Sequence, residues 1–344
     1  MHSRTIPGLD AIRAAAVTMV VLYHQGLPFS GALGVTLFFV LSGFLITTML
    51  LKEFARMRTL SLRNFYRRRS YRIFPTFYVC WVITMLTMVA RHQHIVWKQA
   101  FESFFYMADY GRAFLPVAQQ VTFPVGISWS LAIEEKYYLI WPVVLLALLA
   151  RSVSIGRNVS IVVVGLWIWR AVLVFGFHVP LSYIYNAFDC RADALMIGGL
   201  LSILIYRRSV PNWLLCLIAK RSLILFSLAA MAVVTIFDLQ HAEGTAMYLA
   251  VLSLTPVFAA LLIAQLMFAG CSPGGGGFLE HRAIRFIARI SYAIYLYHPI
   301  ALSYTGLIPV RHAQRILTIP LILAMATASY YLIERPFMRM RDRK

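Results

Sequence analysis

Long apolar runs, separated by short polar or basic segments, recur along the whole chain. An α-helix needs ~20 apolar residues to cross the hydrocarbon core of a bilayer, and about ten runs reach or approach that length. They span residues 9–28, 32–51, 73–91, 129–150, 158–177, 191–206, 222–238, 245–269, 286–306 and 315–334. The pattern predicts an all-α integral membrane protein with about ten transmembrane helices.

The composition agrees with this prediction. Of the 344 residues, 60% are hydrophobic and only 13% are charged, whereas soluble domains carry about 25% charged residues. No polar stretch is large enough to form a soluble domain. We therefore expect a single membrane domain over residues 1–344, with its core at about 5–337 and no appended soluble domain.

The formal net charge of +19 would suggest nucleic acid as a partner in a soluble protein. Here the basic residues fall mainly between the apolar runs, so they indicate topology instead, and no nucleic acid is expected. If the N-terminus is cytoplasmic and the runs alternate, 24 of the 32 lysines and arginines lie on the cytoplasmic side. We expect a multi-pass protein of the cytoplasmic (inner) membrane with both termini in the cytoplasm.

Three segments between the runs stand out. Residues 52–72 are predicted to form a basic cytoplasmic loop, and 92–126 form the longest external segment, rich in aromatic residues. Residues 272–277 (SPGGGG) are typical of a flexible linker. The apolar stretch 211–219 is too short to span and is expected at the interface.

Cysteine usage points to neither a disulfide framework nor a metal site. The four cysteines are scattered, without CxxC or CxxH spacing, and such spacing is what a zinc site requires. No metal is expected. The N-terminal run contains Asp10, Arg13 and His24, so a membrane helix is favoured over a cleaved secretory signal.

His24 ends the first apolar run, and Arg13 lies eleven positions earlier. The two are roughly 16 Å apart along a helix axis. This places Arg13 near the cytoplasmic face and His24 in the outer half of the membrane. Ionisable groups inside a span are costly and suggest function, although an interfacial histidine bonded to a neighbour is an equally good interpretation of His24 alone.

The stretch RRRSYRIFP contains four arginines, followed by Pro75 at the predicted start of a helix. Helix N-termini bind anions, so these arginines form a candidate phosphate site. A positive-inside anchor is the alternative of equal weight. The arginines are Arg67, Arg68, Arg69 and Arg72.

Further charged groups lie inside or beside later runs. Glu134 and Glu135 come early in the fourth run, and Arg191 and Asp193 open the sixth, where they form an ion pair or line an outward-facing polar pocket. His298 lies in the ninth run among tyrosines. By contrast, Ser42 and Gly43 in the second run are interpreted as small residues that allow close helix packing.

Taken together, these motifs resemble acyltransferase family 3, a family of membrane O-acyltransferases. The resemblance runs from residue 8 to 337 and rests on seven stretches in the family's order: GLDAIRAAAVTMVVLYH, GVTLFFVLSGFLIT, FYRRRSYRIFPTFY, SWSLAIEEKYYLIWP, RADALMIGGLL, SYAIYLYHPI and ERPF. Lys136 and Tyr137 depart from it, since many members have glutamine and phenylalanine there.

The resemblance implies about ten transmembrane helices and transfer of an acyl group, often acetyl, from cytoplasmic acyl-CoA to a hydroxyl of a surface glycan or lipid-linked sugar. His24 would act as a general base or a transient acyl carrier, with Arg13 and Glu134 completing the catalytic set. The arginines would clamp the CoA phosphates. The residues expected to bind substrate are Trp129, Glu135, Arg191, Asp193 and His298.

Acyl-CoA is thus expected as a donor substrate, with no tightly bound cofactor. The expected partners are the glycan or glycolipid acceptor, the lipid bilayer and a separate periplasmic protein for any second step. Two alternatives stay open: an O-acyltransferase of a small molecule such as a macrolide sugar, and a transporter of polar lipids. If the protein is a transporter, acyl-CoA should leave its thermal stability unchanged.

Overall fold

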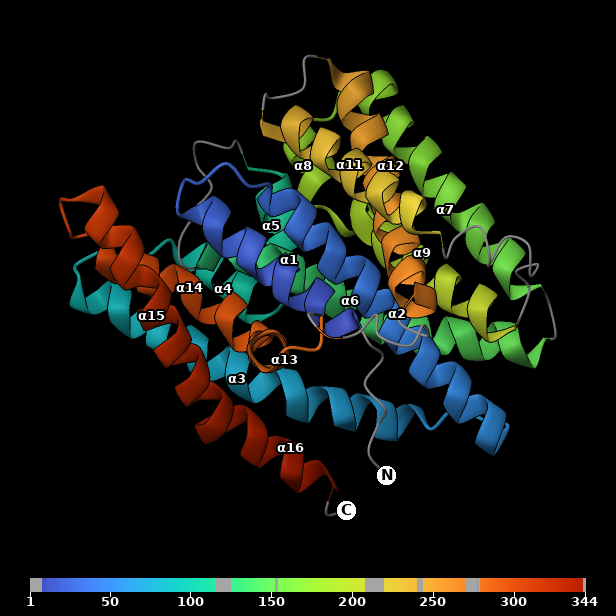
Figure 1. The fold of residues 1–344 in the computed structure, drawn as a ribbon, viewed down its shortest axis with the longest axis horizontal. Helices are drawn as coiled ribbons and strands as arrows, with labels where there is room; N and C mark the ends of the chain where they lie inside the picture. Colours follow the sequence, from blue (N-terminus) through green and yellow to red (C-terminus); the bar gives the residue numbers. More distant parts are fainter. Residues whose placement is uncertain are drawn as a thin grey trace. The chain divides into compact units, whose positions relative to one another are not determined.

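A computed structural model of the chain describes residues 8–115, 125–151, 154–207, 220–239, 244–269, 277 and 279–342. Within these ranges the secondary structure is helical throughout and contains no strand (Figure 1). The predicted all-α class is therefore confirmed for the described part of the chain. The interfacial stretch 211–219 and most of the linker 272–277 lie outside it.

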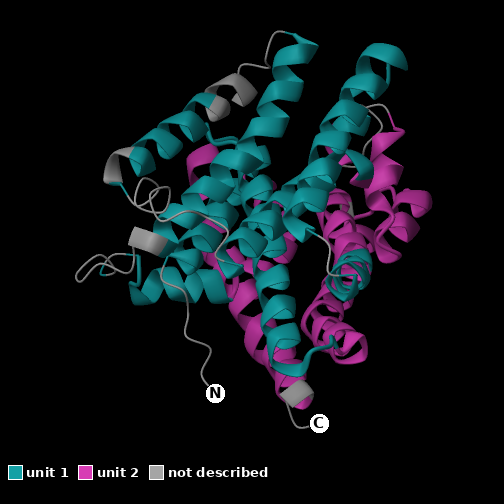
Figure 2. Ribbon diagram, turned by 90° about the vertical axis from the view of Figure 1, so that its right-hand side faces the viewer, with its two compact units in different colours: residues 1–60, 140–184, 189–289 teal, residues 61–139, 185–188, 290–344 magenta. Residues whose placement is uncertain are grey.

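The chain divides into two compact units (Figure 2). Unit 1 comprises residues 1–60, 140–184 and 189–289. Its core is α1 packed on α2, with α12 against both, α11 and α7 against α12, and α13 against α1. Its helices are α1 (Leu9–His24), α2 (Gly31–Met57), the end of α6 (Ser128–Ala150), α7 (Ile155–Ala171) with the π turn Val172–Gly176, the start of α8 (Leu181–Asn186), most of α9 (Phe188–Tyr206), α11 (Arg221–Leu239), α12 (Thr245–Ala269) and α13 (Arg282–Arg289).

Unit 2 comprises residues 61–139, 185–188 and 290–344. In it α14 packs on α15, and both α14 and α16 lie against α3. Its helices are α3 (Leu62–Ala90), α4 (Trp97–Phe104), α5 (Ala108–Ala113), the 3-10 turn Val125–Ile127, the first part of α6, α14 (Ser291–Thr305), α15 (Arg311–Ser329) with the π turn Tyr330–Glu334, and α16 (Arg335–Asp342).

Each of the ten predicted apolar runs overlaps helical structure, and the ninth overlaps two successive helices. Among the described residues, five helices are long and apolar enough to cross a membrane: Gly31–Met57, Leu62–Ala90, Ile155–Gly176, Thr245–Met267 and Arg311–Met340. α1 has 16 residues and is about 24 Å long, less than the ~30 Å of a hydrocarbon core. The count of ten spans and the cytoplasmic termini stay predictions.

The predicted basic loop at 52–72 is wrong. Its first residues continue α2 to Met57, and its last ones belong to α3, which begins at Leu62. Pro75 therefore lies inside α3 instead of opening a helix. Membrane helices tolerate an internal proline because neighbouring groups satisfy the freed carbonyl. The arginines thus lie along a continuous helix, and the argument from a helix N-terminus at Pro75 does not apply.

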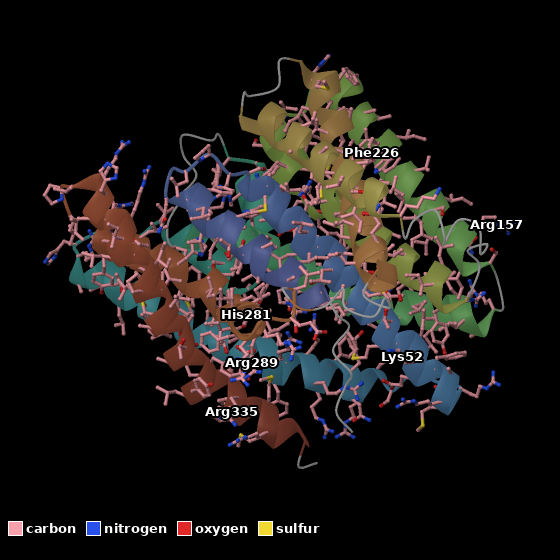
Figure 3. The ribbon with its side chains drawn as sticks, viewed as in Figure 1. Lys52, Arg157, Phe226, His281, Arg289 and Arg335 are labelled. Atoms are coloured by element: carbon pink, nitrogen blue, oxygen red, sulfur yellow. The ribbon has the colours of Figure 1, made fainter. Side chains whose placement is uncertain are left out.

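Two other boundaries differ from prediction. The ninth run, predicted as one helix over 286–306, is divided between α13 and α14, which end and begin at Arg289 and Ser291. The last run is longer than predicted, because the π turn after α15 leads directly into α16. Exposed basic side chains lie on several helices, including Lys52, Arg157, Arg289 and Arg335 (Figure 3).

Within unit 1, α2 and α9 touch backbone to backbone. A Cβ atom built on Gly43 would lie 1.8 Å from the carbonyl oxygen of Leu195, and one on Gly198 would lie 2.0 Å from that of Val40. Each helix thus supplies one glycine at the place where the other's backbone passes. This confirms that Gly43 allows close helix packing.

Polar side chains reinforce the packing of α2. The Thr48 and Ser202 hydroxyls lie 2.7 Å apart between α2 and α9, and the Trp141 indole donates to the Thr47 hydroxyl over 2.8 Å. On the α1 side of α2, a Cβ on Gly34 would lie 2.7 Å from the Ala16 carbonyl oxygen. α2 therefore contacts α1 and α9 through backbone atoms, with little room for adjustment.

We predict that Gly43→Ala destabilises the protein by about 1–3 kcal/mol, because the added methyl overlaps backbone that cannot move without separating the helices. Gly165→Ala on α7 is the matched control, since no atom lies within 4 Å of a Cβ there. Thermal unfolding of the purified proteins in detergent measures both. Equal stability of the two variants would contradict the close contact.

Candidate functional site

His24 is the last residue of α1. Its Nδ1 lies 3.0 Å from the carbonyl oxygen of Val20, one turn earlier. A carbonyl only accepts, so Nδ1 carries the hydrogen, and the neutral ring has its lone pair on Nε2.

Arg13 lies on the same helix, and its guanidinium is 3.5 Å from the Asp10 carboxylate. Both side chains are partly exposed, at 21% and 28%, so the pair contributes little stability. The eleven-residue separation keeps Arg13 roughly 16 Å from His24 along the axis. The structure therefore places the two predicted residues on one helix, about three turns apart.

Asp193 takes part in a buried ion pair with a partner that sequence reasoning missed. The Arg170 guanidinium on α7 donates to it over 2.8 Å. The exposed fraction of the Arg170 side chain is 1% and that of Asp193 is 0%. Trp167 donates to the same carboxylate oxygen over 2.9 Å. Arg170 also reaches the Cys190 carbonyl at 3.1 Å and the Ser253 hydroxyl at 2.9 Å. The pair therefore joins α7, α9 and α12.

Two consequences follow for the predicted outward pocket at Arg191 and Asp193. Asp193 pairs with Arg170, while Arg191 donates to the Thr36 hydroxyl of α2 over 3.0 Å and lies over the Phe39 ring at 5.7 Å. Both are fully buried. The Oδ1 atom of Asp193 has no hydrogen-bond partner among the described residues, so it is the atom on which this carboxylate could still accept a hydroxyl.

The four predicted donor-site arginines lie on the first turns of α3 in unit 2. Arg67, Arg68, Arg69 and Arg72 are all half-buried. The Arg69 guanidinium lies 4.0 Å from the centre of the Tyr138 ring on α6, a cation–π contact that holds the side chain in place.

Tyr138 also connects this arginine to the two glutamates. Its hydroxyl donates to the Glu134 carboxylate over 2.9 Å, one turn back along α6. Arg69 and Glu134 both act electrostatically on Glu135. Unit 2 therefore brings Arg69 together with both predicted glutamates through a tyrosine that the sequence analysis did not select.

The remaining predicted residues of unit 2 are packed inside it. The Trp129 indole lies against the Tyr185 ring, with 5.0 Å between centroids. His298 is fully buried, and its Nδ1 lies 2.7 Å from the Tyr295 carbonyl, so this nitrogen also carries a hydrogen. The Tyr295 hydroxyl lies 2.5 Å from the Ser130 hydroxyl of the α6 motif. α6 and α14 thus share a hydrogen-bonded contact.

Lys136, one of the departures from the family pattern, attaches α5 to α6. Its ammonium lies 2.5 Å from the Asp109 carboxylate and 3.0 Å from the Tyr106 carbonyl. It also lies 5.4 Å from the centre of the Tyr110 ring. Burial raises the pKa of the Asp109 carboxyl, and the bond to Lys136 opposes that shift. α5 is therefore held beside the glutamate motif.

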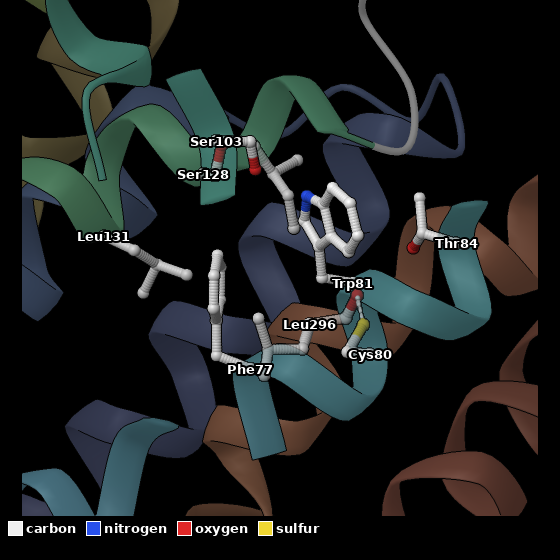
Figure 4. Close-up of a pocket in the computed structure, with 9 residues that line it drawn as sticks. Phe77, Cys80, Trp81, Thr84, Ser103, Ser128, Leu131 and Leu296 are labelled. Atoms are coloured by element: carbon white, nitrogen blue, oxygen red, sulfur yellow. Dashed lines mark hydrogen bonds between the residues drawn. The ribbon is translucent and has the colours of Figure 1, made fainter. Parts of the chain in front are cut away.

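A small cavity of about 20 Å³ lies among α3, α6 and α14 of unit 2 (Figure 4). Phe77, Trp81 and Leu131 line it with the hydroxyls of Thr84, Ser103 and Ser128. The thiol of Cys80 donates to the Leu296 carbonyl at 3.3 Å beside it. The volume suits one water molecule and is too small for a substrate.

The predicted residues thus form two groups. Unit 1 holds Arg13, His24, Arg191 and Asp193, and unit 2 holds the arginines of α3 with Trp129, Glu134, Glu135 and His298. Arg170 could have been found from the sequence, since it is a lone arginine in an apolar run. Tyr138 could have been found from its position four residues after Glu134.

Comparisons with known proteins agree with the motifs. The sequence model of a family described as an acyltransferase domain, acyltransferase family 3, matches residues 6–335. The peptidoglycan O-acetyltransferase OatA of Listeria monocytogenes is 30% identical, over 97% of this chain and 56% of that protein. YrhL of Bacillus subtilis, provisionally named a peptidoglycan O-acetyltransferase, is 30% identical over 97% of this chain and 55% of its own length.

A provisionally named O-acetyltransferase of Staphylococcus aureus (strain COL) is 29% identical over 98% of this chain and 58% of that protein. The chain therefore spans little more than half the length of these relatives. No solved structure matches it significantly.

We predict that Asp193→Ala lowers the free energy of unfolding by about 3–5 kcal/mol, because Arg170 is left buried without its counter-ion. Replacing both residues by leucine should restore much of the loss. The matched control is the Arg285–Glu280 pair, which has the same 2.8 Å separation but is 45% and 38% exposed. Glu280→Ala should cost less than about 1 kcal/mol.

The measurement is a double-mutant cycle on unfolding in detergent. Additive losses at Arg170 and Asp193 would show that the two side chains do not interact.

Proposed function

The chain belongs to acyltransferase family 3, and on that premise we propose that it is a membrane O-acyltransferase that moves an acetyl group from cytoplasmic acyl-CoA to a hydroxyl of a surface glycan. The family match covers nearly the whole chain, and the apolar helices make it a multi-pass membrane protein. The relatives' names support acetyl as the group and a glycan such as peptidoglycan as the acceptor.

One observation carries the proposal: the hydrogen bond between His24 Nδ1 and the Val20 carbonyl. Because Nδ1 holds the hydrogen, the lone pair that chemistry requires is on Nε2, and the backbone fixes the ring's orientation. The family's arginine–histidine pattern falls on Arg13 and this residue.

In the base route, Nε2 takes the proton of the acceptor hydroxyl while its oxygen attacks the thioester carbonyl. The carbon–sulfur bond breaks, and the leaving CoA thiolate takes the proton from the imidazolium. In the carrier route, Nε2 attacks the thioester carbonyl first, the carbon–sulfur bond breaks, and CoA thiolate leaves an acyl-imidazole behind. The acceptor oxygen then attacks the acyl carbon, the carbon–nitrogen bond breaks, and the acceptor proton passes to the CoA thiolate. The Nε2 lone pair serves both routes. Rapid quenching of a reaction with labelled acetyl-CoA distinguishes them by the presence or absence of labelled protein.

The arginines of α3 suit the donor, since CoA carries several phosphate charges and guanidinium pairs with phosphate through two parallel hydrogen bonds. Acyl-CoA enters as a substrate and leaves as CoA, so no resident cofactor is required. We assign Glu134 and Glu135 to orienting the acceptor. The Asp193 Oδ1 atom lacks a hydrogen-bond partner among the described residues. We assign it to accept a hydrogen bond from a hydroxyl of the glycan.

We predict that His24→Ala abolishes acetyl transfer, while acetyl-CoA binding measured by calorimetry changes less than about threefold. The reason is that the imidazole acts on the proton or the acyl group and not on the CoA phosphates. His312→Ala, at an exposed position at the start of α15, is the control and should keep full activity.

The outcomes also separate the competing functions. Unchanged transfer in His24→Ala would remove the histidine from the mechanism. No binding of acetyl-CoA by the wild-type protein would favour the polar-lipid transporter.

We further predict that Arg68→Gln with Arg69→Gln raises the KM for acetyl-CoA by about tenfold or more, because each lost charge-assisted bond costs about 1.5–3 kcal/mol. The KM for the acceptor should change much less. Arg63→Gln is the matched control, since it is exposed on the same helix. Equal effects on donor and acceptor would indicate that these arginines serve topology only.

A further inference from the structure

The two short helices after α3 border a hollow of about 430 Å³ within unit 2. Its main lining residues are Lys98, Phe101 and Glu102 of α4, Phe105 beside it, Tyr110 of α5 and Phe114 beside that helix. We call this hollow the aromatic groove. Its volume falls in the range of small-molecule sites, ~300–1,000 Å³. No role assigned above uses it.

Aromatic rings line both sides of the groove. On the α4 side, Phe101 lines the groove, and the Trp97 ring lies beside it with 6.2 Å between the two ring centroids. On the α5 side, the Tyr110 and Phe114 rings are stacked at 6.5 Å with an angle of 24°. Phe101, Phe105 and Phe114 are 56%, 66% and 73% exposed. Exposed apolar rings gathered around one concave surface are typical of an interaction site.

The groove also contains one placed polar group, the Glu102 carboxylate. A Cβ atom on Gly111 of α5 would lie only 2.2 Å from Glu102 Oε2, so the absence of a side chain at Gly111 makes room for the carboxylate. The Glu102 side chain is 20% exposed, and the Lys98 ammonium lies 3.8 Å from it. Burial raises the pKa of the Glu102 carboxyl, and Lys98 opposes the shift.

The aromatic rings and the Glu102 carboxylate together discriminate among possible ligands of the groove. A quaternary ammonium would suit an aromatic cage, but Lys98 already supplies a cation to the carboxylate and makes the pair neutral. A lipid acyl chain would cover the carboxylate without offering it a hydrogen bond, which is costly. A sugar ring fits both features, because its CH faces pack on aromatic rings and its hydroxyls donate to the carboxylate.

The position of the groove within unit 2 supports the same occupant. Lys136 ties α5 to α6 through Asp109 and lies over the ring of Tyr110, which is itself in the groove wall. Lys136 follows Glu134 and Glu135 directly in sequence. Lys136, which departs from the family pattern, therefore ties one wall of the groove to α6, the helix that carries the two glutamates to which we assign the acceptor.

We propose that the aromatic groove is a subsite for sugar rings of a neutral glycan, which holds the acceptor strand beside the α6 glutamates. The inference rests on the proposed function for the identity of the acceptor. The binding itself requires no catalysis, so it is tested separately from acetyl transfer.

The experiment uses the purified protein in lipid nanodiscs and a soluble tetramer of β-1,4-linked N-acetylglucosamine as the probe. Saturation-transfer NMR detects contact with the sugar protons, and calorimetry measures affinity. Phe105→Ala and Glu102→Gln should each weaken binding by about tenfold, the usual effect of losing a central aromatic or charged contact. Gly111→Ala should act in the same direction by displacing the Glu102 carboxylate.

Phe177→Ala is the matched control, because Phe177 is 68% exposed and lies in unit 1. It should leave binding unchanged. Binding by the wild-type protein that is insensitive to Phe105→Ala and Glu102→Gln would overturn the assignment of the groove. If the protein binds the probe but does not transfer acetyl groups, the proposed function is wrong and the subsite still stands.

A membrane contact is the competing outcome. It is measured by quenching of Trp97 fluorescence by brominated lipids, taken as the difference between wild type and Trp97→Phe. Strong quenching together with no binding of the tetramer would show that the groove faces lipid, and the proposal would be wrong. Weak quenching with binding supports the glycan subsite.

Discussion

The backbone contact between α2 and α9 is the constraint on which much of unit 1 depends. Gly43 and Gly198 allow it, because any larger side chain would overlap the opposite backbone. α1 packs on the other side of α2, at Gly34. The position of His24 therefore follows from a succession of backbone contacts, not from its own hydrogen bond alone. α9 is fixed in turn by the ion pair of Asp193 with Arg170.

The length of the apolar runs predicted where the helices lie but not where they begin and end. Each predicted apolar run overlaps helical structure, since helices are the simplest way to satisfy the backbone in lipid. The basic segment at 52–72 is helical at both ends, because charged residues alone do not end a helix. Nothing in it except the turn before Leu62 breaks a helix. Pro75 was overvalued as a start signal, since a neighbouring helix can compensate for its missing amide.

The candidate site was predicted in part. The motif residues were found from charges inside apolar runs and from the family resemblance, which identify residue types in order along the chain. Their partners depend on tertiary packing, and sequence alone does not give it. The sequence suggests an ion pair between Asp193 and its near neighbour Arg191. The structure pairs Asp193 with Arg170 instead, 23 residues earlier in the chain. The cation–π contact at Tyr138 was not foreseen for the same reason.

Tyr138 makes two contacts through one rigid ring: its face holds Arg69 and its hydroxyl holds Glu134. An anion that binds the Arg69 guanidinium competes with the face of the Tyr138 ring. A shift of that ring would change the hydrogen bond from its hydroxyl to the Glu134 carboxylate. The occupancy of the arginines and the orientation of Glu134 are then thermodynamically linked, and such linkage is reciprocal. Through this one aromatic side chain, each of the two sites would change the affinity of the other by the same factor.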